Sequence, residues 1–221
     1  MGSYNTIREF FAYLNNRCEY LILRNWDDVY NDTIYGDSHE DIDILCGNLD
    51  EFVRLTDAER IHKERQRSNF IVPIGSMSVR FDVRYVGDGY YPIAWQQKML
   101  RDRILTGQGF FIMNPIDYTY SLAYHALLQK PGLSEEYRKK INGALAELSS
   151  SHDECSLVEQ ELIERLIQHC DENGYVVEIP IDPGVYLNYR KINKMHHKVS
   201  IARILKRELF MIKNKVKRYL Q

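Results

Sequence analysis

The sequence predicts an α/β (α+β) fold, in which a mixed β-sheet core with flanking helices is followed by a helical domain and a basic C-terminal helix. Residues 1–90 alternate between short extended runs and segments of helical spacing. Residues 91–185 show helical spacing almost throughout, and residues 186–221 carry eleven Lys or Arg against one acid. We therefore expect a sheet-containing core over 1–90, a helical domain over 91–185 and a basic amphipathic segment over 186–221.

The predicted elements of the core alternate between helices and short strands. Apolar side chains three or four residues apart predict a first helix, with Ser3 as its N-cap. Asp41–Leu45 alternates between acidic and apolar residues, which is typical of a strand. In chain order we expect a helix at 4–16, a buried strand at 19–24, a short helix and loop at 26–35, a strand at 41–45 and a helix from 49 to 55.

Three further extended stretches are predicted at 59–65, 69–74 and 77–86. Gly75-Ser76 joins the last two as a hairpin. The stretch from Ser78 to Val86 alternates strongly, so its apolar side chains share one face of a strand. Asp82 lies on the opposite, polar face between Arg80 and Arg84.

Beyond Gly87 the pattern becomes helical. We expect helices near 93–104, 116–129, 134–148, 156–172 and 199–219, with a short strand at 175–179. The last helix repeats apolar residues every three or four positions, with Lys and Arg between them, which is typical of an amphipathic helix.

Charge and hydropathy exclude some classes of protein. The net charge is −2, but residues 186–221 hold +10 and the preceding residues hold −12, which is a first sign of a polyanionic partner. Three alternatives stay open for this tail: a solvated amphipathic helix packed on the body, a helix at the surface of an anionic membrane, and a segment that binds nucleic acid or polyphosphate. Mean hydropathy is −0.43, and no apolar run approaches the roughly 20 residues of a membrane-spanning helix.

The cysteines and the N-terminus predict a cytoplasmic protein. No pair is close in sequence, unlike in a disulfide scaffold or a zinc site, so we expect reduced thiols at Cys18, Cys46, Cys155 and Cys170. The first residues lack the basic and apolar segments of a secretory signal. The basic tail adds the alternative of a peripheral position at a membrane.

Three carboxylates predict a metal site. Asp41 and Asp43, two residues apart on one strand, project from the same face. Pairing the strand of Asp82 beside them would bring three acids to one edge. Three acids can hold two Mg²⁺ or Mn²⁺ ions, which suits in-line attack at phosphorus: one ion activates the hydroxyl and the other holds the triphosphate. Asp82 is expected beside the nucleophile.

This order of elements resembles the nucleotidyltransferase-fold superfamily, the group of DNA polymerase beta and the aminoglycoside nucleotidyltransferases. The resemblance covers about residues 4–90. It implies that Asp41 and Asp43 are the paired metal ligands and that Asp82 is the third. It also implies an NTP donor such as ATP, Mg²⁺ as cofactor and a following helical domain.

The chain departs from the family after the first strand. The family has Gly-Ser there, whereas this sequence has Arg24-Asn25. Gly36 and Ser38 lie too close to Asp41 for the usual intervening helix. Phosphate is therefore expected either at Arg24 and Asn25 or in the loop of Gly36 and Ser38.

Other side chains are weaker candidates. Arg80 and Arg84 would either neutralise Asp82 or bind phosphate, and the ion pair is favoured. Tyr90, Tyr91 and Trp95 are candidates for stacking on a nucleobase, although a turn leading into packed aromatic residues is favoured. His125 would contribute to the predicted metal and nucleotide site only if its helix lines that site.

We therefore predict a transferase that moves a nucleotidyl or phosphoryl-linked group onto a hydroxyl acceptor. The phosphocholine transferases of the LicD and fukutin type have a similar acidic strand, which adds surface glycans as acceptors. Two alternatives stay open: a catalytically degenerate protein of the same fold, and a protein that binds a polyanion or an anionic membrane through 186–221. Nucleotide, acceptor and oligomeric state are open as well.

Overall fold

The computed structural model describes residues 4–26, 29, 41–62, 68–149 and 157–219, with the backbone alone at 214, 215 and 217–219. Two compact units are distinguished: Met1–Gly87 with Ala94–Tyr118, and Asp88–Ile93 with Thr119–Gln221. The division that the sequence predicts at residues 90 and 185 stays a prediction.

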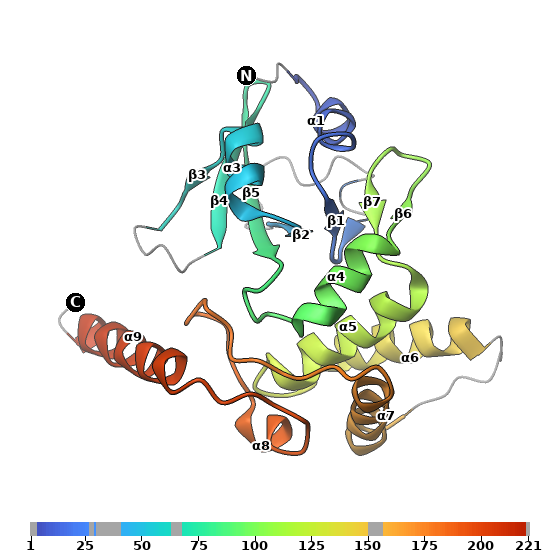
Figure 1. The fold of residues 1–221 in the computed structure, drawn as a ribbon, viewed down its shortest axis with the longest axis vertical. Helices are drawn as coiled ribbons and strands as arrows, with labels where there is room; N and C mark the ends of the chain where they lie inside the picture. Colours follow the sequence, from blue (N-terminus) through green and yellow to red (C-terminus); the bar gives the residue numbers. More distant parts are fainter. Residues whose placement is uncertain (1–3, 27–28, 30–40, 63–67, 150–156, 220–221) are drawn as a thin grey trace. The chain divides into compact units, whose positions relative to one another are not determined.

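A seven-stranded mixed sheet forms the centre of the first unit, in the order β3-β4-β5-β2-β1-β7-β6 (Figure 1). β2 pairs in parallel with β5 and antiparallel with β1. The strands are β1 (Tyr20–Ile22), β2 (Ile42–Cys46), β3 (Glu59–Arg60), β4 (Asn69–Ile74), β5 (Met77–Tyr85), β6 (Ile104–Leu105) and β7 (Phe111–Ile112). The predicted α/β class with a mixed sheet is confirmed.

Helices complete both units. The first unit holds α1 (Ile7–Leu14), α3 (Leu49–Thr56) and most of α4 (Ile93–Arg101). The second holds most of α5 (Pro115–Leu128), and also α6 (Glu135–Ser149), α7 (Glu159–Glu172), α8 (Tyr189–Ile192) and the basic helix α9 (Ile201–Tyr219). None of the helices in the described residues is long and apolar enough to cross a bilayer.

Two helices, α1 and α3, cover one face of the sheet. The opposite face carries the acidic residues of β2 and β5. Phe10 of α1 and Phe52 of α3 both pack against Phe81 of β5, with ring centroids 5.5 and 6.2 Å apart. Ile42 and Ile44 of β2 belong to the same buried cluster. Because neighbouring residues of a strand point to opposite faces, residues between these apolar positions lie on the other face.

Local sequence explains where these elements begin and turn. α1 starts at Thr6, whose hydroxyl accepts a hydrogen bond from the Glu9 amide at 3.2 Å, so the N-cap is Thr6 and not the predicted Ser3. Gly75 makes the predicted hairpin turn at φ +59°, where a Cβ would lie 2.6 Å from the Asn5 carbonyl oxygen. Only glycine satisfies both requirements without strain.

Some predicted boundaries differ from the structure. α4 ends at Arg101, and the strand β6 replaces the end of the predicted helix. β7 adds to the sheet through Ile112, which pairs with Ile22 of β1. The predicted strand at 175–179 is a single bridge at Val177. A strand of two residues, such as β6 or β7, is too short to show a periodic pattern, so neither could be predicted from the sequence.

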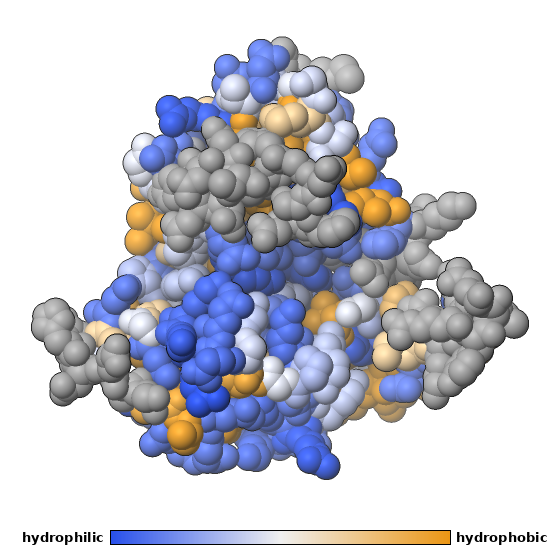
Figure 2. Space-filling view, turned by 180° about the vertical axis from the view of Figure 1, so that it is seen from behind, coloured by the Kyte–Doolittle hydropathy of each residue, from blue (hydrophilic) through white to orange (hydrophobic). Residues whose placement is uncertain are grey.

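On the face drawn in Figure 2, apolar residues form separate patches among hydrophilic ones.

Candidate active site

Asp43 of β2 and Asp82 of β5 lie directly opposite each other in the parallel register. Both sit between apolar positions that point into the covered face, so the two carboxylates project from the opposite face of the sheet. Asp41, two residues before Asp43, precedes the strand. Burial, and to a lesser extent the charge of Asp43, raises the pKa of both Asp41 and Asp82. The structure therefore places Asp43 beside Asp82, with Asp41 two residues before Asp43 in the chain.

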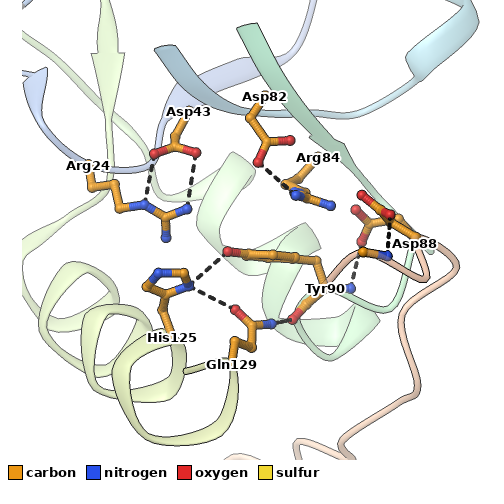
Figure 3. A network of polar contacts seen from close by, with 10 residues as sticks. Arg24, Asp43, Asp82, Arg84, Asp88, Tyr90, His125 and Gln129 are labelled. Carbon is orange, nitrogen blue, oxygen red and sulfur yellow. Dashed lines mark hydrogen bonds and ion pairs between the residues drawn. The ribbon is translucent and has the colours of Figure 1, made fainter. Parts of the chain in front are cut away.

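Arg24 holds Asp43 through two hydrogen bonds. Its Nε donates to Oδ2 at 2.8 Å and its Nη2 to Oδ1 at 3.0 Å (Figure 3). The side chains are only 10% and 16% exposed. Arg24 follows β1, whose antiparallel pairing with β2 brings that turn beside Asp43, and the Leu23 amide donates to the Asp43 carbonyl oxygen at 2.8 Å. This two-bond geometry is the one that guanidinium also uses with phosphate.

The turn after β1 has an unusual backbone. Asn25 adopts φ 56°, in the left-handed region that glycine enters most readily and that asparagine tolerates better than most residues. The chain therefore makes a glycine-like turn at the position where the resemblance predicts Gly-Ser. Gly36 and Ser38, the alternative phosphate loop, lie outside the described residues.

Two further arginines engage the remaining acids. Nη2 of Arg84, a buried residue, donates to Asp82 Oδ2 at 2.7 Å (Figure 3). Nε of Arg80 lies 3.0 Å from Asp41 Oδ1, and its side chain is 43% exposed. The predicted pairing of Arg84 with Asp82 is present, whereas Arg80 pairs with Asp41 instead of Asp82.

Burial shifts Asp41 and Asp82 toward their neutral forms. Desolvation raises the pKa of Asp82 above its usual value, and Arg84 opposes this shift only in part. The pKa of Asp41 is also raised by burial, with Arg80 acting in the opposite direction. Asp82 Oδ1 is buried and has no hydrogen-bond partner among the described residues.

The donor set suits a hard divalent cation, because carboxylate oxygens are the ligands that Mg²⁺ and Mn²⁺ prefer. The unpartnered Asp82 Oδ1 is one coordination point of this kind. Each acid is turned toward its own arginine, and no group of three His, Cys, Asp or Glu within the described residues is arranged around a common point. A cation shared by the three acids would require these guanidinium groups to turn away from the carboxylates.

The aromatic candidates are buried and do not form a stacking surface. Trp95 is fully buried, and its Nε1 donates to Asp117 Oδ1 at 2.8 Å. In the second unit, the Tyr90 hydroxyl lies 2.9 Å from His125 Nδ1, which also contacts Gln129 Oε1 at 3.0 Å (Figure 3). Burial and these internal hydrogen bonds agree with the favoured interpretation of packed aromatic residues and not with the alternative of stacking on a base.

The sequence did not indicate a hollow of about 550 Å³ in the first unit. Gly47 and Val86, which directly follow β2 and β5, help to line it. It lies beyond the carboxyl ends of these strands, whereas Asp43 lies near the start of β2, so the hollow is separate from the acids. Its charged lining residues come from three separate segments, which no local pattern reveals: Glu19, Glu51, and Arg101 with Arg103.

Comparison with known proteins adds one structural likeness. No family model and no curated protein matches the chain. The solution structure of the antibiotic-resistance factor ANT(2'')-Ia is similar at a TM-score of 0.40 and 12% identity, over 76% of this chain and 94% of that one. A similarity of this size does not establish a shared function, so the functional conclusion rests on the geometry of the acids.

Proposed function

We propose that this chain is a nucleotidyltransferase that depends on Mg²⁺ or Mn²⁺ and moves a nucleotidyl group from an NTP onto a hydroxyl acceptor. The observation that carries the proposal is the register that sets Asp43 opposite Asp82, with Asp41 nearby. Three carboxylates on or just before two adjacent strands, on the face that α1 and α3 do not cover, suit phosphoryl chemistry better than a purely structural role.

The metal ligands would be Asp41, Asp43 and Asp82. A bound cation supplies neutralising charge for the triphosphate and lowers the pKa of a hydroxyl. Asp82 would also accept the proton of the hydroxyl, because its buried Oδ1 has no hydrogen-bond partner among the described residues. The acceptor oxygen would bond to the α-phosphorus as the bond to the bridging oxygen breaks, with pyrophosphate leaving and the proton passing to Asp82.

Arg24 and Arg84 would bind the triphosphate. Both guanidinium groups already lie at the acids and make charge-assisted hydrogen bonds of 2.7–3.0 Å. Exchanging a carboxylate oxygen for a phosphate oxygen keeps such bonds intact. The glycine-like turn at Asn25 brings the chain close to the same place.

A second candidate is a nucleotide-binding protein without turnover. Its support is that the three acids are matched by three arginines, so the cluster is close to charge-neutral without a metal. This candidate predicts nucleotide binding that does not require a divalent cation, because arginines alone would hold the phosphates.

Thermal unfolding with each NTP, with and without Mg²⁺ or Mn²⁺, tests the proposal. At about 100 times the dissociation constant, a ligand raises the unfolding temperature by about 5–10 °C. We expect this rise only when cation and nucleotide are both present, and we expect Asp82→Asn to abolish it. Asp102→Asn is the matched control, because Asp102 also pairs with an arginine but lies outside the cluster.

Release of pyrophosphate in the presence of hydroxyl compounds separates transfer from binding. A nucleotide-induced rise that is unchanged by chelation, without pyrophosphate release, would support the binding protein and refute the transferase. No rise with any nucleotide would refute both.

A further inference from the structure

One side of α9 is fixed to the second unit by two arginines. Arg203 Nη1 donates to the Ile179 carbonyl oxygen at 2.7 Å and lies 3.4 Å from Glu178 Oε2. Arg207 is buried, with Nη1 donating to the Asp182 carbonyl oxygen at 3.2 Å and Nη2 to that of Val185. One helical turn separates the two arginines, so they set the rotation of the helix about its axis.

The opposite side of α9 is an exposed apolar stripe. Its members recur every three or four residues and are 51–72% exposed: Ile201, Leu205, Leu209, Ile212 and Val216. Each residue of a helix advances by about 100°, which sets this stripe roughly opposite the two arginines. The arginine contacts therefore turn the apolar side chains outward.

Basic charge accompanies the stripe. Residues 186–221 carry +10, and Glu208 is their single acid. Lys206 and Lys213 are both exposed and lie along one flank of the stripe. An apolar stripe beside lysines is the pattern of a helix that lies in the surface of an anionic bilayer, with alkyl chains under the stripe and lipid phosphates or carboxylates at the lysines.

We propose that α9 docks this protein on an anionic lipid surface, with the apolar stripe inserted between headgroups and the helix parallel to the membrane. The helix has 19 residues and is about 28 Å long, so it presents all five apolar side chains along the surface. This inference rests on α9 alone and does not depend on the function proposed for the acids.

The charge and the stripe together disfavour other occupants. A second copy of α9 would bring two basic helices together, each with seven Lys or Arg against Glu208, and like charges repel. A nucleic acid would satisfy the lysines but would leave five large apolar side chains in water. An anionic bilayer satisfies both features at once.

Flotation of the full chain with vesicles tests the proposal. We expect binding to phosphatidylcholine vesicles that contain phosphatidylserine, weak binding to phosphatidylcholine alone, and loss of binding as salt is raised. Substituting Leu205→Gln and Leu209→Gln together should weaken vesicle binding by about tenfold or more, because both side chains lose most of their apolar surface. Circular dichroism should show unchanged folding, since both side chains are exposed.

The matched control substitutes two similarly exposed apolar residues of the first unit, Leu105→Gln and Ile116→Gln, and should bind vesicles as the wild type does. Equal vesicle binding by the stripe variant would overturn the proposal. Two other results would also overturn it. The first is binding to a single-stranded RNA that the stripe variant retains and that vesicles do not displace. The second is a dimer, detected by light scattering, that the stripe variant no longer forms, together with no binding of the wild type to vesicles.

Discussion

Replacing Arg84 with methionine removes the charged partner of a buried carboxylate. Arg84 is 6% exposed, and the Asp82 side chain that it holds at 2.7 Å is 16% exposed. Removing one partner of a buried ion pair costs about 3–5 kcal/mol. Arg24 also lies near enough to lower the pKa of Asp82, so we expect the lower end, about 3 kcal/mol, or a fall of about 6–12 °C in unfolding temperature.

The loss should depend on pH with a defined sign. The folded-state pKa of Asp82 is raised, so this group lowers stability as pH rises from its unfolded pKa through its folded pKa. Without Arg84 the pKa rises further, and the penalty is then largest at neutral pH. Acidification protonates Asp82, so the difference between variant and wild type should be smaller at about pH 5 than at about pH 7.5.

Thermal unfolding followed by circular dichroism measures these differences. The double variant Asp82→Asn with Arg84→Met should recover part of the loss, because no charge is then left unpaired. Arg101→Met is the matched control. Arg101 precedes β6 by 3 residues and pairs with Asp102 at the surface, where its side chain is 69% exposed. Its replacement should therefore lower the free energy of unfolding by no more than about 1 kcal/mol. An Arg84→Met protein that unfolds within about 2 °C of wild type at neutral pH would refute the reasoning.

Two further predictions concern the fold. Gly75→Ala should lower the unfolding temperature by several degrees, because the added Cβ would lie 2.6 Å from the Asn5 carbonyl oxygen and the residue has a positive φ. In Gly107→Ala the added Cβ meets nothing within 4 Å, so this control should leave the unfolding temperature almost unchanged. Equal effects of the two substitutions would contradict this account. Burial raises the pKa of the Cys18 and Cys170 thiols to about 12. After treatment with a thiol reagent near neutral pH, peptide mapping should therefore show these cysteines labelled only when the protein is in denaturant. Rapid labelling of the native chain would contradict their burial.

Most of the fold class could be predicted from periodicity. The alternation around Asp82 and Asp43 predicts two strands with acids on one face, and the structure pairs these strands with the two acids in register. The helices beyond Gly87 follow from the spacing of apolar residues. In both cases the pattern is local, and a repeat of two or 3.6 residues reports directly which side chains share a face.

The arginine partners were less accessible to prediction. Arg80 and Arg84 both share a face with Asp82, so strand alternation alone could not choose between them. Arg84 holds Asp82, and Arg80 reaches Asp41 on the neighbouring segment. The choice depends on the register between strands, which arises from contacts distant in sequence.

The N-cap of α1 shows the same limit on a smaller scale. Ser3 and Thr6 are both good capping residues. The apolar spacing of the helix begins at Ile7, and the buried packing of Phe10 and Phe11 on the sheet selects Thr6 as the cap. Capping propensity therefore identifies the possible N-cap residues, and the burial of the helix decides which of them caps it.

By itself the sequence determined the mixed sheet, the acidic positions on one face of two strands, and the amphipathic basic helix at the end of the chain. Only the tertiary structure decided that Arg24, Arg80 and Arg84 each take a different acid, and that Arg203 and Arg207 turn the apolar stripe of α9 outward. The reason is that a side chain's face follows from its position in a repeat, whereas its partner follows from which distant segment packs beside it.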